Sequence, residues 1–169
     1  HLPRLESVVN DLCLYNSFHL AGVDMPSLES ISGALDIHDN SVLTSLGMSG
    51  LRSVGDYLVI QDNASLTTLD GLSSLSSVGG YLTIDENDAL TSLDIDGLAS
   101  VLDDLSVRDN PLLSGIGLPS LSSVGERLNI EGNDSLTGLE GLSSLSSVGD
   151  SLYISDNASL TSLDGLSSI

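Results

Sequence analysis

The sequence has no lysine and no tryptophan, and it has few aromatic residues and few positive charges. Four arginines stand against 24 acidic residues, which gives the 169-residue chain a formal net charge of −20. A protein that binds nucleic acid needs a basic surface to neutralise phosphates, so this composition excludes nucleic acid as a partner. No stretch of about 18 consecutive apolar residues is present, and we therefore expect no membrane insertion in this segment.

Motifs that carry chemistry are also missing. The single cysteine, Cys13, cannot form a disulfide within the chain, and a free thiol is the simpler interpretation of it. There is no G-x-S-x-G nucleophile motif, no P-loop and no glycine-rich nucleotide-binding turn. The three histidines lack the spacing of a metal site. The sequence therefore predicts neither an enzyme nor a bound cofactor.

What the sequence does have is an internal repeat, built largely from 34 leucines and 32 serines. The apolar residues that open the units are 23 or 24 residues apart: Leu5, Leu28, Leu51, Leu75, Leu98, Leu121, Leu145 and Ile169. Each unit continues with Val or Ile, then an apolar pair such as Leu58 and Ile60, then Asn and two further apolar residues. Self-similarity at such a period is the signature of a solenoid.

The pattern within one unit predicts strands rather than helices. Leu58, Val59 and Ile60 alternate as in a half-buried strand, and the intervening Ser-rich stretches are poor helix formers. A single unit cannot bury its own apolar row, whereas stacked units can. We therefore expect an all-β solenoid of seven 23–24-residue coils that occupies the whole chain, residues 1–169. Residues 1–27 form a divergent first coil, and residues 28–169 form regular coils that we expect to belong to a longer array or fibre.

One polar column runs through the repeat. Because a buried Asn must satisfy both its donors and its acceptor, we expect a hydrogen-bonded Asn ladder inside the solenoid. Its members are Asn40, Asn63, Asn87, Asn110, Asn133 and Asn157. Three of them, Asn63, Asn133 and Asn157, are also N-x-Ser glycosylation sequons, which we expect to be mostly unused. A glycine column (Gly55, Gly79, Gly125 and Gly149) follows the Val column, where we expect tight bends with positive φ.

The run L-x-I-x-x-N-x-x-L-x-x-L, together with the fuller pattern "SVGGYLTI…N…LTSLDGLSSL", resembles leucine-rich repeats and is similar to the receptor L-domain family. That family includes ligand-binding halves of growth-factor receptor ectodomains and fungal cell-wall surface proteins. The resemblance covers Leu5 to Ile169. It implies a right-handed parallel β-helix-like solenoid, an extracellular or cell-surface location and no catalysis.

Two surface rows carry further hypotheses. An acidic row precedes the Asn column and predicts a solvated face or, alternatively, a Ca²⁺ site, since carboxylate oxygens suit that ion. Its members are Asp39, Asp62, Glu86, Asp109 and Asp156. A hydroxyl row suggests ordered water, as in ice-binding solenoids, and contains Thr44, Thr67, Thr91, Thr137 and Thr161.

The composition and the repeat favour a non-enzymatic extracellular structural or adhesive protein that self-associates end to end into fibrils. Two alternatives are a ligand-binding cell-surface ectodomain, with a glycan or a protein as ligand, and an ice-binding protein. An exposed aromatic cluster that continues over several coils around Tyr57, Tyr81 and Tyr153 would favour the ectodomain, whereas scattered tyrosines would favour the structural role.

Overall fold

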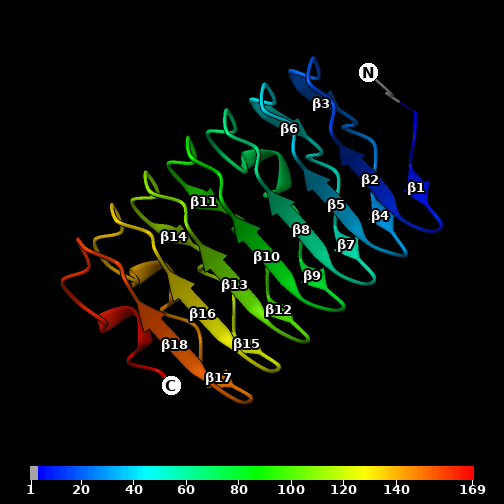
Figure 1. Ribbon diagram of the computed structural model, residues 1–169. Coiled ribbons are helices and arrows are strands. Elements are labelled where there is room, and N and C mark those ends of the chain that lie inside the picture. The colour runs from blue at the N-terminus through cyan, green and yellow to red at the C-terminus, as the bar shows by residue number, and fades with distance from the viewer. Residues whose placement is uncertain (1–3) are drawn as a thin grey trace.

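The computed structural model describes residues 4–169, which form a parallel β-solenoid of stacked coils (Figure 1). Residues 1–3 of the predicted first coil lie outside the described residues. Each of the two main sheets has seven strands, and every strand pairs in parallel with its counterpart in the next coil. The predicted all-β solenoid with stacked coils is therefore confirmed.

The longer strands form one side of the solenoid. In chain order they are β2 (Leu12–Tyr15), β5 (Leu35–His38), β8 (Leu58–Gln61), β10 (Leu82–Asp85), β13 (Leu105–Arg108), β16 (Leu128–Glu131) and β18 (Leu152–Ser155). The register follows the repeat without a slip, so that Leu82 pairs with Leu58 on one side and with Leu105 on the other. The apolar pair of each unit points inward, and the second and fourth residues of each strand point outward.

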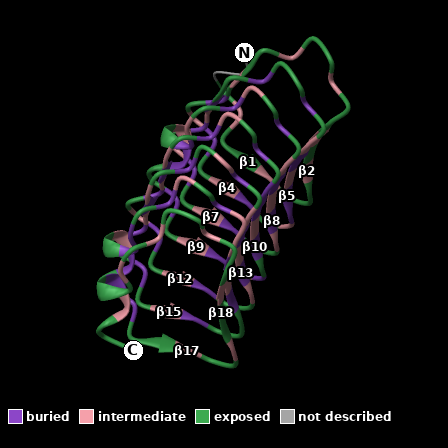
Figure 2. Cartoon of the chain, turned by 60° about the vertical axis from the view of Figure 1, so that its left-hand side comes forward, coloured by how far each residue is buried: buried purple, intermediate pink, exposed green. Residues whose placement is uncertain are grey.

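A second sheet is made of two-residue strands that are nearly identical in sequence. They are β1 (Ser7–Val8), β4 (Ser30–Ile31), β7 (Ser53–Val54), β9 (Ser77–Val78), β12 (Ser100–Val101), β15 (Ser123–Val124) and β17 (Ser147–Val148). Six of the seven read Ser-Val, and the remaining one reads Ser-Ile. The Val or Ile of each strand belongs to the apolar core or packs against it. Figure 2 shows that the interior strands of this sheet are buried or half-buried.

The third side of the coil accommodates the difference in length between coils of 23 and coils of 24 residues. Shorter coils cross it with a strand, as in β3 (Gly22–Asp24), β6 (Ser45–Gly47), β11 (Leu93–Asp94) and β14 (Ile116–Gly117). Coils with the extra residue form a 3₁₀ turn instead: η1 (Asp70–Leu72), η2 (Glu140–Leu142) and η3 (Asp164–Leu166). Both routes reach the core, because Met48 lies two residues after Leu46 and Leu72 lies three residues after Leu69, and all four are buried. None of these short turns could span a membrane, and no other helix occurs in residues 4–169.

The apolar columns form one continuous core in the interior coils. From Leu28 to Leu145 the column residues are nearly inaccessible to solvent, as predicted. In the last coil the prediction is wrong for Leu152 and Leu163, which are 41% and 54% exposed, because no further coil packs on them. A solenoid coil buries its apolar face only against a neighbour, so burial requires a coil on each side.

The Asn ladder is present and fully bonded in the interior coils. Asn40, Asn63, Asn87, Asn110 and Asn133 are completely buried. The side-chain nitrogen of Asn87 donates to the carbonyls of Asp85 (2.8 Å) and Ile60 (3.0 Å). Its side-chain oxygen accepts a bond from the backbone N–H of Asn63 (3.2 Å). Asn157 is only partly buried, although it makes the same two donations, to Ile130 and Ser155.

The glycine column has a different cause from the predicted one. None of Gly55, Gly79, Gly125 and Gly149 has a positive φ. Instead, the neighbouring coil approaches so closely that a Cβ on Gly125 would lie 1.7 Å from the carbonyl oxygen of Leu102. Glycine is required here because the stacked backbones touch, and not because the bend needs a left-handed residue.

We predict that Asn87→Ala destabilises the fold by roughly 3 kcal/mol, because it leaves the buried N–H of Asn63 without an acceptor and removes a side-chain donor from the carbonyls of Asp85 and Ile60, at about 1–3 kcal/mol for an unsatisfied group and about 1 kcal/mol for each lost bond. Denaturant melts followed by circular dichroism measure this loss. Asn129→Ala, which replaces an Asn outside the ladder, is the matched control and should change stability by less than about 0.5 kcal/mol. Equal losses in both variants would contradict a structural role for the ladder.

We also predict opposite effects for two glycine substitutions. Gly125→Ala should cost about 1–3 kcal/mol or more, since the added methyl group overlaps the backbone of the neighbouring coil. Gly115→Ala should be neutral or should stabilise by about 0.4–1 kcal/mol, because no atom lies within 4 Å of the added Cβ. Thermal melts of the two variants, measured side by side, check this difference in sign.

Candidate functional site

The acidic row has a conformational role that the sequence reasoning missed. Its five members, Asp39, Asp62, Glu86, Asp109 and Asp156, all have positive φ between 50° and 57°. Asn16 and Gly132 occupy the same position in their coils and also have positive φ. Asn, Asp and Gly tolerate this left-handed conformation best, so the residue types of the column were the available signal. Glu86 is the exception to that preference.

The described residues contain no group of three or more His, Cys, Asp or Glu side chains arranged to hold a metal ion. The acidic row instead places like charges one coil apart. Burial raises the pKa of Asp62 above its ordinary value, and the neighbouring carboxylates of Glu86 and Asp39 raise it further. Calcium binding by this row stays a prediction.

The predicted hydroxyl row bonds to the protein itself at several positions. The hydroxyls of Thr44, Thr91 and Thr161 donate to carbonyls of the preceding coil, at 2.9–3.1 Å. Corner serines do the same, as when Ser76 donates to Arg52 and Ser146 donates to Ser122. These bonds link successive coils and give the abundant hydroxyl residues a structural role. Nothing in the geometry tests ice binding, which stays a prediction.

The other predicted positions are divided between the interior and the surface. Asn63 and Asn133 are buried, and their side-chain nitrogens donate to backbone carbonyls, so a glycan could be attached only if the side chain left the ladder. Cys13 is exposed on β2 and has no disulfide partner among residues 4–169. Burial and the carboxylates of Asp36 and Asp11 raise its pKa, which disfavours a reactive thiolate.

One surface differs from the rest of the solenoid, and we call it the outer face. It consists of the second and fourth residues of each longer strand together with the residue that precedes the strand. In chain order these are Asp11, Cys13, Tyr15; Ala34, Asp36, His38; Tyr57, Val59, Gln61; Tyr81, Thr83, Asp85; Asp104, Ser106, Arg108; Arg127, Asn129, Glu131; Ser151, Tyr153 and Ser155. No two coils carry the same three residues, whereas the second sheet is almost invariant. All four tyrosines, the only cysteine and the only glutamine of the chain lie here.

The aromatic residues of the outer face form stacks between adjacent coils. The rings of Tyr57 and Tyr81 are parallel within 3°, with centroids 4.8 Å apart. Tyr15 stacks in the same way on His38, at 5.0 Å. Burial, and next the nearby Asp36 carboxylate, raise the pKa of the Tyr57 and Tyr81 phenols above the ordinary value. The aromatic side chains thus line four consecutive coils, and Tyr153 lies further along the same face.

Two ion pairs cross neighbouring strands on this face. Arg108 forms a two-point contact with Asp85, whose side chain is only 7% exposed. Burial raises the pKa of Asp85, and the Arg108 guanidinium opposes that shift. Arg127 holds Asp104 in the same way, through its Nε at 3.2 Å and a terminal nitrogen at 3.1 Å, and its backbone N–H adds a bond of 2.9 Å.

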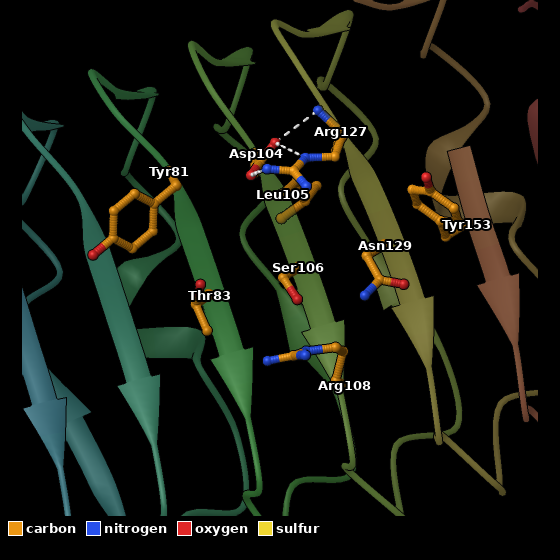
Figure 3. A pocket seen from close by; sticks show the side chains of 9 residues that line it. All are labelled: Tyr81, Thr83, Asp104, Leu105, Ser106, Arg108, Arg127, Asn129 and Tyr153. Carbon is orange, nitrogen blue, oxygen red and sulfur yellow. Dashed lines mark hydrogen bonds and ion pairs between the residues drawn. The ribbon is translucent and has the colours of Figure 1, made fainter. Parts of the chain in front are cut away.

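Between the tyrosines the outer face is hollowed (Figure 3). A depression of about 300 Å³ has Tyr81 at one end and Tyr153 at the other. Its floor consists of Thr83, Ser106 and Asn129, three short polar side chains on successive strands. A neighbouring depression of about 470 Å³ shares Tyr81 and Thr83 and extends toward Val59. We call the two depressions together the groove.

The sequence reasoning identified Tyr57, Tyr81 and Tyr153 as a contact surface but missed the ion pairs and the groove. A signal for the ion pairs was available, since Asp85 and Arg108, like Asp104 and Arg127, are 23 residues apart and occupy matching positions in consecutive units. The groove had a weaker signal in the small residue Ser106, which lies between larger neighbours.

Comparison with known proteins adds no family to this description. The chain matches no protein family, no curated protein and no solved structure at a significant level.

We predict that the protein becomes more stable as pH falls from 7 toward about 4, the ordinary pKa of Asp, at low ionic strength. The folded-state pKa values of Asp62 and Asp85 are raised, so the folded state binds their protons more tightly than the unfolded state. Stability therefore increases as pH falls through the folded pKa values and decreases as pH rises above them. Thermal melts across this range measure the effect.

The contribution of the acidic row should also depend on salt, because screening weakens repulsion between exposed like charges. Raising the salt concentration to about 0.5 M should stabilise the protein at pH 7 and reduce the pH dependence. Asp62→Asn should likewise be more stable than the natural chain at pH 7 and should respond less to pH. A melting temperature that falls steadily from pH 7 to pH 5 would contradict the prediction.

Proposed function

We propose that the protein is a non-enzymatic recognition module of the extracellular space or the cell surface, and that it binds its ligand on the outer face. The observation that carries the proposal is the contrast between the two sheets. One sheet repeats Ser-Val almost unchanged from coil to coil, whereas the outer face of the other differs in every coil. The fold requires only outward-pointing side chains at those positions, so their diversity fits a surface that presents a particular chemistry.

The composition of the outer face supports the same function. Tyrosine and arginine are the residue types that contribute most at binding surfaces, because they combine large contact areas with polar tips. Tyr15, Tyr57, Tyr81 and Tyr153 all lie on this face, in a chain with only one other aromatic residue, Phe18. Tyr57 and Tyr81 stack on adjacent coils, whereas Tyr15 and Tyr153 lie apart from them, so the aromatic residues support a ligand-binding ectodomain through this pair and not through one continuous cluster.

The resemblance to receptor L domains belongs to this proposal, as does the absence of catalysis. In such repeat proteins, a rigid solenoid displays side chains from many coils on one extended surface. A rigid scaffold suits recognition because the binding side chains lose little conformational freedom when the ligand arrives. End-to-end assembly into fibrils remains a separate prediction.

A variant that lacks the large side chains of the outer face tests the function. It replaces four exposed or half-buried residues with serine: Tyr57, Tyr81, Arg127 and Tyr153. The natural chain and this variant are screened against arrays of glycans, peptides and proteins, and each ligand found is titrated by calorimetry. We expect the variant to retain its melting temperature within a few degrees and to bind at least about tenfold more weakly.

A matched control carries four substitutions to threonine at exposed corner serines: Ser73, Ser74, Ser143 and Ser144. This control should bind as tightly as the natural chain. The proposal is wrong if the fourfold serine variant of the outer face still binds the ligand as tightly as the natural chain. It is also wrong if the corner control loses binding to the same extent. A natural chain that binds nothing in any of the three arrays would do the same.

A further inference from the structure

We infer that the groove between Tyr81 and Tyr153 binds a neutral, hydroxyl-rich chain, namely an oligosaccharide of uncharged sugar rings. The inference rests on the proposed recognition function and specifies the ligand. It follows from four properties of the groove: its openness, its paired arginines, its unused hydrogen-bonding groups and its aromatic ends.

The shape of the groove suits an extended ligand that lies on the surface. Its two depressions are continuous and open to solvent, and polar side chains form much of the lining. Sites for compact apolar ligands are instead deep and mostly hydrophobic. The distance from β10, next to Tyr81, to β18, which carries Tyr153, is three strand spacings, or roughly 14 Å. This length fits several linked sugar rings better than a single one.

The arginines that line the depression between Tyr81 and Tyr153 are each paired with a carboxylate, whereas the neighbouring depression also carries the carboxylates of Glu86 and Asp109. Arg108 is neutralised by Asp85 and Arg127 by Asp104, in each case through two contacts to one carboxylate. The chain as a whole carries a net charge of −20 and repels anions. An acidic ligand would have to compete with carboxylates that are already in place, and between Tyr81 and Tyr153 a cationic ligand would find only carboxylates that already hold an arginine. The electrostatics therefore favour a neutral ligand.

The paired arginines still have donors to offer. A guanidinium group has five N–H donors, and each carboxylate contact uses only two of them, which leaves about three on each arginine. The carboxylates hold the guanidinium planes in position, so these donors have fixed directions. On the floor, Thr83 and Ser106 add hydroxyls that both donate and accept. Asn129 adds a side-chain amide to the lining. Such a set of groups matches a ligand with many hydroxyls.

The aromatic ends supply the apolar part of the contact. The C–H groups on one face of a pyranose ring carry slight positive charge and pack against the negative face of an aromatic ring. Tyr153 is 55% exposed and Tyr81 is 38% exposed, so both retain accessible ring surface. Figure 3 shows the Tyr81 hydroxyl pointing away from Ser106 and Asn129, so the phenol oxygen does not occupy the depression between Tyr81 and Tyr153. The stack with Tyr57 fixes the Tyr81 ring in place.

The test is native affinity electrophoresis of the full chain in gels that contain a neutral polysaccharide, followed by an array of neutral and acidic oligosaccharides. The probes are a soluble β-glucan, a mannan, a galactan and soluble oligomers of N-acetylglucosamine. We expect at least one of the four to retard the natural chain. Tyr153→Ala and Ser106→Tyr, which fills the floor without touching the core, should each weaken that retardation by about tenfold or more.

Tyr15→Ala is the matched control, because Tyr15 is exposed on the same face, outside the groove. It should bind as the natural chain does, and the melting temperatures of all three variants should confirm that they fold. If the chain binds only acidic glycans, peptides or proteins, and Ser106→Tyr abolishes that binding, the inference that the ligand is a neutral oligosaccharide is wrong. The proposed recognition function would still hold. If Ser106→Tyr is retarded as strongly as the natural chain, the glycan does not bind in the groove. Absence of any ligand in both sets of arrays would overturn the recognition function as well.

Discussion

The in-register stacking of one coil on the next is the constraint on which the rest of the structure depends. Each residue of the longer strands is paired with a residue 23 or 24 positions away in the next coil, so the repeat length sets the register. The Asn ladder, the glycine column and the corner hydroxyls all act between neighbouring coils. Apolar burial has the same origin, since each coil covers the core of its neighbour.

Much of the fold could be predicted from the sequence because the same apolar pattern occurs in seven units, and each unit supports the assignment made for the others. A polar residue at one of the repeated apolar positions would have argued against stacked coils, and none occurs between Leu28 and Leu145. Local backbone geometry was less accessible. The glycine column was interpreted as a conformational requirement, yet Gly125 is needed because the backbone of the preceding coil touches it. A sequence shows that a position excludes side chains, but the contact responsible lies one coil away.

The candidate site was predicted only in part, for a related reason. Repeated residues reveal the scaffold, whereas the outer face consists of the residues that do not repeat. Tyr57 and Tyr81 were noticeable because aromatics are rare in this chain, whereas Arg108, although one of only four arginines, was not matched with Asp85 one unit earlier. Their two-point contact and the burial of the carboxylate become evident only when strands β10 and β13 lie side by side.

The two kinds of corner have a consequence for how such a chain can change over generations. A corner that closes either as a strand or as a 3₁₀ turn absorbs the gain or loss of one residue while Met48 and Leu72 both reach the core. An unequal duplication therefore need not disturb the alignment of the strands that follow it. Copies of the scaffold can be added or trimmed by imprecise genetic events, and the strands remain in register. The side chains on the outer face are then free to diverge independently, one coil at a time.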